Sequence, residues 1–385
     1  TGCVAKSDLA QAIAVDITDD GCAVATPSAE AGAVTFSLTN NGSDVNEFEI
    51  LAEDQLRIVG EKENVTPGQE IEFVAQLGPG TYYTACKFQQ VGAPVGLAEF
   101  TVTGEASAVS ADEQELSDQA VTEYLAYVRS QAAELVPLVE AFATAYAAGD
   151  DETARSLFAS TRVPYERIEP TAEAFGDLDP KIDFREVDAV ADGLEWTGFH
   201  RIEKDLWPPA PGALNSDGQD AFLDWAPSTP EQRQAYADGL VADVTELHDL
   251  VTADDFTVSL DAISNGAIAL LDEVAAGKIT GEEDWWSGTD LSDFAANVQG
   301  AGVAFGAVRA LAESKGSDGE ALAAEIDAQF VALEEALSAY GSLESGFVNY
   351  AELTDADKKA LSDQVNALAE PLSQLTHTVL AEPES

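Results

Sequence analysis

The chain has 385 residues, of which 45% are hydrophobic, so it is long enough to form two domains that each bury a core. It carries 18 Lys and Arg against 71 Asp and Glu, a formal net charge of −53. Binding to nucleic acid or to anionic lipid headgroups needs basic side chains, so this charge disfavours both. The same charge attracts cations, although it is equally explained by solubility or adaptation to salt.

The chain begins Thr1-Gly2-Cys3 and contains no Met. We interpret this beginning as the end of a bacterial lipoprotein signal, where cleavage leaves a cysteine to be acylated, with a chance Gly-Cys pair as the alternative. Residues 1–10 are then a tether lipidated at Cys3. No later stretch approaches the roughly 18 apolar residues of a membrane helix, so we expect membrane attachment through lipid only.

Residues 11–104 predict a small β-domain. Short runs in which apolar and polar residues often alternate, such as 34–38, are separated by turn sequences such as Asn40-Asn41-Gly42. Strands of this length and spacing are typical of a β-sandwich.

Residues 105–116 are small and polar, and we interpret them as a linker that leads into a helix capped by Ser110 or Ser117. In residues 117–385, apolar side chains recur at intervals of three and four residues, which predicts an all-α bundle without strands. The sequence therefore predicts a multidomain α+β chain. The later helices are expected at about 231–252, 259–276, 289–314, 318–340 and 355–379.

Two proline-containing segments interrupt this helical pattern. A helix is expected to begin within 151–160, and Pro164 is suited to the first turn of a helix. The proline-rich stretch 208–230 predicts a long loop, and loops of this length in compact domains are usually functional or mobile.

The segment just before that loop contains one of only three histidines, His200, with Glu203 three residues later. On a helix these two side chains share a face beside an apolar stripe that includes Phe199 and Ile202. A charged pair at the edge of a buried stripe points into a core or a cleft, where ionised groups must be paired or bound to metal. The alternative is a core histidine that only bonds the nearby glutamate.

Further acidic residues repeat this three-residue spacing. Glu166 and Glu169 would share a helix face, as would Asp183 and Glu186, and Glu283 could close the same cleft from a loop. Helix bundles build metal sites from such inward-facing carboxylates and a histidine. One imidazole with several carboxylates suits Fe(III), Fe(II), Mn(II) or Zn(II) rather than Cu(I). The alternative is a set of solvated pairs on separate helices.

Other candidates are weaker. His248 and His377 are expected at the surface, Trp285 and Trp286 in packing roles, and Thr289 as a helix cap. There is no His-Glu-x-x-His motif, no Gly-x-Ser-x-Gly motif and no free Cys–His pair, so no catalytic set can be named and we do not expect an enzyme.

Several motifs, in order, resemble the imelysin-like family, which is nominally a peptidase family. They are Gly-Phe-His-x-x-Glu-Lys-x-Leu from Gly198, Tyr-Glu-Arg-Ile-Glu-Pro from Tyr165, Ile-x-Gly-Glu-Glu-Asp from Ile279 and Leu-Thr-Asp-Ala-Asp from Leu353. More narrowly, nearly the whole chain resembles the extracytoplasmic component of a bacterial iron-uptake system. One departure is Gly288, where the family pattern has a histidine.

This resemblance implies an imelysin-like helical bundle whose metal ligands are Glu166, Glu169, Asp183 and His200. Glu203 is implied either as a ligand or as the acceptor that orients the imidazole, and Glu283 as a further ligand. The implied ion is iron, Fe2+ or Fe3+, with Zn2+ as a second possibility for the same site.

The order of segments before residue 105 resembles a cupredoxin, with Pro79 to Cys86 matching the strand that carries the copper thiolate. Type 1 copper needs two histidines, and none precedes His200, so we expect no such copper. In an exported protein the remaining Cys22 and Cys86 suggest a disulfide that closes a long loop. A weak carboxylate site remains an alternative to solvated acids, with the candidates Glu47, Glu49, Glu61 and Glu63.

The resemblance therefore implies an exported, lipid-anchored protein of the cell surface or periplasm. It would capture iron and pass it to a membrane permease, together with a haem peroxidase of the same system. Two alternatives are a zinc metallopeptidase and a protein that binds acidic polysaccharide, although the net charge argues against the latter without bridging cations.

Overall fold

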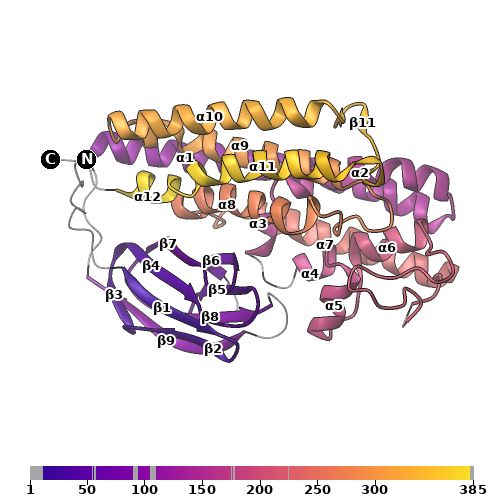
Figure 1. Ribbon diagram of the computed structural model, residues 1–385, viewed down its shortest axis with the longest axis horizontal. Helices are drawn as coiled ribbons and strands as arrows, with labels where there is room; N and C mark the ends of the chain where they lie inside the picture. Colours follow the sequence, from indigo (N-terminus) through magenta and orange to yellow (C-terminus); the bar gives the residue numbers. More distant parts are fainter. Residues whose placement is uncertain are drawn as a thin grey trace.

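The computed structural model describes residues 12–53, 55, 58–89, 94–104, 110–174, 176, 178–223 and 225–381. The expected tether and Cys3 lie outside these residues. A β-domain packs against one side of a layer of long helices (Figure 1). The sequence-based expectation of a β-rich first part and a helical second part is confirmed.

The β-domain is a sandwich of two sheets. One sheet has the order β2-β1-β4-β7 and the other β3-β9-β8-β5-β6. Phe36, Phe48 and Phe100 meet between the sheets, with Phe36 5.3 Å from Phe48 and 5.6 Å from Phe100 between ring centroids. The strands are β1 (Ile13–Thr18), β2 (Gly21–Val24), β3 (Ser28–Glu30), β4 (Gly32–Asn40), β5 (Asn46–Leu51), β6 (Ile58–Val65), β7 (Glu70–Leu77), β8 (Gly80–Phe88) and β9 (Val95–Thr103).

The predicted disulfide is confirmed. Cys22 on β2 and Cys86 on β8 are bonded, with their Cα atoms 5.7 Å apart, so the bridge joins the two sheets. It closes a loop over a sequence separation of 64 and thereby stabilises the sandwich by about 2–4 kcal/mol.

The second part of the chain is mainly helical. Ser110 caps the first helix by accepting from the backbone N–H of Glu113 at 3.2 Å, so this helix begins at Ala111, within the segment 105–116 that was expected to be linker. The long helices are α1 (Ala111–Ala147), α2 (Asp151–Glu166), α7 (Pro230–Thr252), α8 (Leu260–Glu273), α9 (Asp290–Glu313), α10 (Ser317–Ser338) and α11 (Asp355–Leu372).

Shorter elements connect the long helices. They are α3 (Glu169–Glu173), α4 (Asp179–Ile182), α5 (Glu186–Asp192), α6 (Gly198–Leu206), the π-helical turn η1 (Val274–Lys278), the 3-10 turn η2 (Tyr350–Glu352), α12 (Leu375–Leu380) and the strands β10 (Gly341–Ser342) and β11 (Gly346–Phe347). The small β10–β11 hairpin was not expected from the sequence.

The expectation for Pro164 was wrong, because it lies in the last turn of α2 and not in a first turn. Proline has no N–H to donate to the preceding turn. The helix nevertheless continues to Glu166, and Val163, Pro164 and Tyr165 are all buried, so tertiary packing outweighs the lost hydrogen bond.

The β-domain is attached to α8 by specific contacts. The backbone N–H of Gln76 donates to Asp261 at 2.6 Å, Asn265 donates to the carbonyl of Val74 at 3.0 Å, and Lys62 pairs with Asp272. These contacts are spread along α8, so this helix belongs to the packing of both domains. Among the described residues, none of the helices is both long and apolar enough to span a membrane.

Candidate metal centre

Helix α6 begins at a position where only glycine fits. Gly198 has φ +79°, and a Cβ on it would lie 2.2 Å from the carbonyl oxygen of Ile182. The missing side chain therefore lets α6 pack directly against the end of α4. This close approach places His200 beside Asp183, the residue that caps α4.

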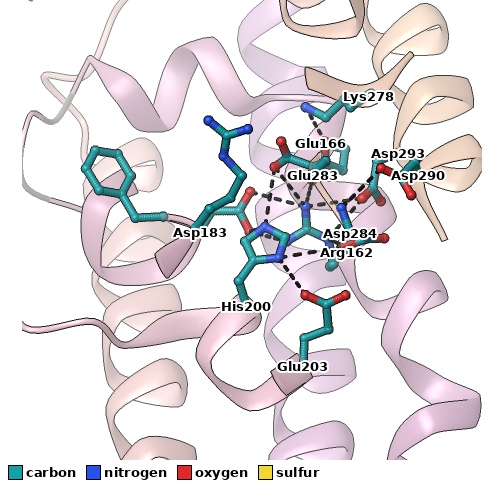
Figure 2. Close-up of polar contacts among 12 residues, drawn as sticks. Arg162, Glu166, Asp183, His200, Glu203, Lys278, Glu283, Asp284, Asp290 and Asp293 are labelled. Carbon is teal, nitrogen blue, oxygen red and sulfur yellow. Dashed lines mark hydrogen bonds and ion pairs between the residues drawn. The ribbon is translucent and has the colours of Figure 1, made fainter. Parts of the chain in front are cut away.

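His200 and Glu203 share a face of α6, as the sequence predicts, and both are buried. His200 Nδ1 lies 3.2 Å from Glu203 Oε2 (Figure 2). The other oxygen of Glu203 accepts from the backbone N–H groups of Trp286 and Ser287, at 3.0 and 2.7 Å. Glu203 thus orients the imidazole and also holds the loop that carries Glu283.

The other ring nitrogen of His200 faces two carboxylates. Nε2 lies 3.3 Å from Glu283 Oε1 and 3.7 Å from Asp183 Oδ1, and it has no hydrogen-bond partner. One atom from each of these three residues lies within 4.8 Å of the other two, a spacing that a single ion could bridge. His200, Glu203 and Glu283 line a small pocket whose other walls include Trp285, which is 41% exposed, so the pocket leads from this group toward the surface.

The charge on His200 reflects these carboxylates. Burial and the nearby Arg162 guanidinium disfavour the imidazolium, but Asp183, Glu203 and Glu283 outweigh them and raise the pKa of His200 to about 10. Burial opposes ionisation of Glu283, yet Lys278 and His200 hold its pKa well below the ordinary value. Without an ion, the group is therefore a protonated imidazole facing an ionised carboxylate.

Glu166 and Glu169 meet near Asp183, but not on one helix as predicted. Glu166 ends α2 and Glu169 begins α3, and the chain between them turns so that both side chains point inward. Glu166, Glu169 and Asp183 form a second group whose oxygens lie within 4.8 Å of one another. The structure therefore brings together all six residues expected at the site.

Two buried cations already compensate this second group. The guanidinium of Arg162 pairs with Glu166 at 2.5 Å and with Asp183, and Lys278 Nζ lies 3.0 Å from both Glu166 and Glu169 (Figure 2). Arg162 also reaches the group formed by Asp183, His200 and Glu283, since its guanidinium pairs with Asp183 and lies 3.7 Å from Glu283. What distinguishes this group is the imidazole, which adds a nitrogen ligand to the carboxylates.

Sequence reasoning missed Arg162, Lys278 and Asp293 as parts of the site, and it noted Asp284 only in the run with Glu283. Arg162 is fully buried, and besides Glu166 and Asp183 it lies 3.2 Å from Asp293 and 3.9 Å from Asp284. Its position four residues before Glu166 is a spacing that could have found it. Lys278 ends the π-helical turn η1, which has no pattern that the sequence would reveal.

The acids around Arg162 differ in their tendency to ionise. Burial outweighs Arg162 and His200 and raises the pKa of Asp183 to about 7. Burial also raises the pKa of Asp284 and Asp293 well above the ordinary value despite Arg162. Many neighbouring carboxylates cannot all be ionised in a buried space, so the site holds protons as well as internal cations.

Several other expectations have clear outcomes. Glu186 begins α5 and pairs with Lys204 instead of joining Asp183. Thr289 is at the N-cap position of α9, but its hydroxyl donates to Asp284 and makes no cap bond. His248 and His377 are half-buried, and His248 Nδ1 lies 3.2 Å from Asp249. Trp286 is half-buried, whereas Trp285 is 41% exposed.

The four glutamates of the β-domain are brought together on β5 and β6. Burial and the charge of Glu49 raise the pKa of Glu47 to about 8, and burial with the charge of Glu47 raises that of Glu63 to about 8. Glu61 also has its pKa raised well above the ordinary value, chiefly by burial. Glu47 and Glu49 are buried, whereas Glu61 and Glu63 are half-buried, and a weak metal site among them stays a prediction.

Two family profiles confirm the expected cupredoxin-like and imelysin-like parts of the chain. The imelysin family profile matches residues 120–375, and the cupredoxin-like domain profile matches residues 4–96. The iron uptake system component EfeO of Escherichia coli K12 and that of Shigella flexneri are each 38% identical over 367 residues, which cover 94% of this chain and 90% of theirs. A solved imelysin-like protein from Psychrobacter arcticum 273-4 is 11% identical, with a TM-score of 0.45 over 73% of this chain and 99% of that one.

Proposed function

The chain belongs to the imelysin family, and from that membership we propose that it is the exported iron-binding component of an uptake system. Relatives that match nearly its whole length are named as iron uptake system components, which supports a role in iron uptake. Iron is here the cargo, which the protein captures and later releases.

The observation that carries the proposal is that His200 Nε2 lies 3.3 Å from an oxygen of Glu283 and 3.7 Å from one of Asp183, three possible ligand atoms in one place. An imidazole with carboxylates is an oxygen-rich set suited to Fe(II) or Fe(III), and also to Zn(II). The carboxylate of Glu203 accepts a hydrogen bond from Nδ1 of His200, which fixes the imidazole with its Nε2 directed at the ion. An arriving ion must displace the proton on this ring, so capture is favoured by higher pH.

We assign Glu166 and Glu169 to the edge of the same site. Both stay paired with Arg162 or Lys278, and Asp183 is shared between them and the His200 group. An ion bound at His200 would weaken the hold of Asp183 on Arg162, and Glu166 could then join as a ligand. The internal cations therefore keep the empty site compact and are in competition with the cargo.

Delivery follows from the same proposal. The protein would be anchored through a lipid at Cys3 and would pass iron to a membrane permease, with a haem peroxidase as a further partner. The dense negative charge supports capture of cations at the outer face of a membrane.

Zinc peptidase activity is the alternative. It is less well supported because Glu203, the acid nearest His200 on α6, accepts two backbone N–H groups and the imidazole, and so is not free to act as a base. Cleavage of a peptide library by the zinc-loaded protein, abolished by Glu203→Gln, would favour this alternative over iron capture.

The test of the proposal is the change His200→Ala. Loss of one ligand should weaken iron binding at least about tenfold, measured by calorimetry with Fe(II) under anaerobic conditions and with a ferric chelate. The control is His248→Ala, which removes a half-buried histidine with an acidic neighbour far along α7. Equal affinity of the His200→Ala and unsubstituted proteins for both forms of iron would reject this site.

A further inference from the structure

The ammonium of Lys204 lies among three indole rings next to the site. Its Nζ is 5.6 Å from the ring centroid of Trp196, 5.2 Å from that of Trp225 and 4.9 Å from that of Trp286. It also pairs with Glu186 and donates to Asn215 at 3.1 Å. The Lys204 side chain is fully buried, so these groups replace its water completely.

The groups around Lys204 come from separate segments of the chain. Glu186 is on α5, Trp196 precedes α6, Asn215 and Trp225 lie in the long loop 207–229, and Trp286 lies in the loop 279–289 after η1. Trp225 is 6% exposed and its Nε1 has no hydrogen-bond partner, so ring contacts hold it in place. One ammonium thus contacts every segment that borders the site from this side.

The same segments form the walls of the pocket that leads to His200. Its lining includes Glu186, Trp196, Asn215 and Trp286, and it also includes Glu283. Two neighbouring residues of α6 hold the loop 279–289. Glu203 accepts from the backbone of this loop, and Lys204 contacts the ring of Trp286 in it. The two loops also meet directly where Trp285 donates to the carbonyl of Leu214 at 3.0 Å.

We propose that Lys204 is the positioning residue of the metal centre, whose ammonium fastens the loops 207–229 and 279–289 together over His200. It touches neither His200 nor the ion and acts through the loop that carries Glu283. The fastened loops keep Glu283 facing His200 Nε2 and narrow the exit of a captured ion. This inference rests on the proposed function, since it concerns how long the cargo is retained.

A single substitution of Lys204 would leave Glu186 unpaired, and a lone charge in a nearly buried place destabilises the fold by itself. The pair Lys204→Met with Glu186→Gln removes both charges and keeps both volumes. The matched control is Lys359→Met with Asp363→Asn, which removes an exposed pair of the same kind, 2.7 Å apart, on α11. Comparing the two double variants distinguishes the effect of losing any ion pair from the effect of losing the Lys204–Glu186 pair.

The probe is Tb³⁺, a hard trivalent ion whose luminescence is excited by nearby indoles. Four of the five tryptophans of the chain, Trp196, Trp225, Trp285 and Trp286, surround Lys204 or line the pocket. Stopped-flow mixing with Tb³⁺ and then with excess chelator measures binding and release separately. We expect release to be about tenfold faster in the Lys204/Glu186 pair variant, with a binding rate changed by less than about threefold.

A second readout does not depend on metal. Hydrogen exchange in the ion-free protein should increase at the amides of 207–223 and 279–289 in the Lys204/Glu186 variant, and not in α10 or the β-domain. The control pair should leave both readouts unchanged.

The outcomes separate this inference from the proposed function. If the unsubstituted protein binds Tb³⁺ and the Lys204/Glu186 variant has normal release and normal exchange, the role of Lys204 is rejected and the site stands. Exchange that increases throughout the chain would also reject it, because the loss would then be general. If His200→Ala binds iron normally while loop exchange still increases, the proposed function fails but Lys204 remains the fastener of the loops.

Discussion

Arg162 illustrates at the residue scale how one side chain can set the charge of a whole site. It is fully buried and lies within 4 Å of five carboxylates, so it supplies in the empty site the positive charge that an ion would otherwise bring. It also lies over the rings of Phe158 and Phe199, 5.7 and 5.4 Å from their centroids. The guanidinium is thus held by carboxylates at its N–H groups and by aromatic rings near its central carbon.

We therefore expect Arg162→Met to destabilise the ion-free protein by about 3–5 kcal/mol, the usual result of removing one partner from a buried ion pair. The loss should be larger at pH 8 than at pH 5, because the acids left behind can take up protons at the lower pH and stay neutral. Urea unfolding in the presence of chelator measures both values.

The control for Arg162→Met is Arg309→Met. Arg309 pairs with Glu313 and Asp327 but is 42% exposed, so its removal should change stability by less than about 1 kcal/mol. Equal losses for the two variants, or a loss at Arg162 that does not depend on pH, would contradict the role given to this residue.

At the scale of elements, the loop 279–289 depends on a close contact with η2. Gly281 has φ +79°, and a Cβ there would lie 2.0 Å from the ring of Tyr350. Tyr350 donates to the carbonyl of Ile279 at 2.7 Å and its backbone N–H donates to Gly288 at 2.9 Å. The ring therefore fills the space inside the loop that carries Glu283.

Gly281→Ala should consequently displace this loop from Tyr350. We expect a loss of about 2–3 kcal/mol in stability from overpacking and strain, and weaker iron binding because Glu283 moves away from His200. Thermal unfolding and calorimetry measure the two effects.

Gly316→Ala separates strain from the clash with the ring. Gly316 also has a positive φ, +94°, but a Cβ there would meet no heavy atom within 4 Å. This variant should lose less stability, about 1 kcal/mol, and bind iron normally. Iron binding by Gly281→Ala that matches Gly316→Ala would show that the loop does not set the position of Glu283.

The periodic apolar pattern located α7, α9 and α10 to within a few residues, because burial of one helix face is encoded locally. The single helix expected at 355–379 was wrong, because the chain forms two helices there, α11 and α12. The pairing of Glu166 with Glu169 was found by spacing although its local geometry was wrong, since the break between α2 and α3 depends on tertiary packing. Lys278 could not be found, because it reaches the site through a π-helical turn and its partners there, Glu166 and Glu169, lie more than 100 residues away.

At the scale of the whole molecule, the half-buried glutamates of β6 lie where the β-domain meets α8, and the neighbouring strand β5 carries the buried Glu47 and Glu49. Lys62, between Glu61 and Glu63, pairs with Asp272, and the charges of Asp272 and Glu273 are close enough to affect these acids. Their raised pKa values mean that the folded protein holds protons that the unfolded chain would release at neutral pH.

These raised pKa values make the stability of the folded protein depend on pH. The pKa of Glu47 is about 8 in the folded protein against 4.5 ordinarily, so its contribution to stability is complete below about pH 4.5 and is lost as the pH rises through 8. Glu47→Gln mimics the protonated side chain. In ion-free protein we expect this variant to be more stable than the original at pH 9 by on the order of 2 kcal/mol, with little difference at pH 4.5.

Urea unfolding at the two pH values measures this effect. Glu70→Gln, at an exposed position at the start of β7, is the control and should change neither value. A gain for Glu47→Gln that is the same at both pH values would mean that the carboxyl is not protonated in the folded protein.

The contacts along α8 have a consequence for how this chain can be divided. Gln76, Val74 and Lys62 of the sandwich bind residues from the first to the last turn of that helix, and α8 leads directly into the turn that ends at Lys278. A cut between the two family regions would thus uncover one side of α8 and loosen the segment that holds Glu166 and Glu169. The chain matches two family profiles, but the packing that shapes the candidate metal centre involves both parts of the chain.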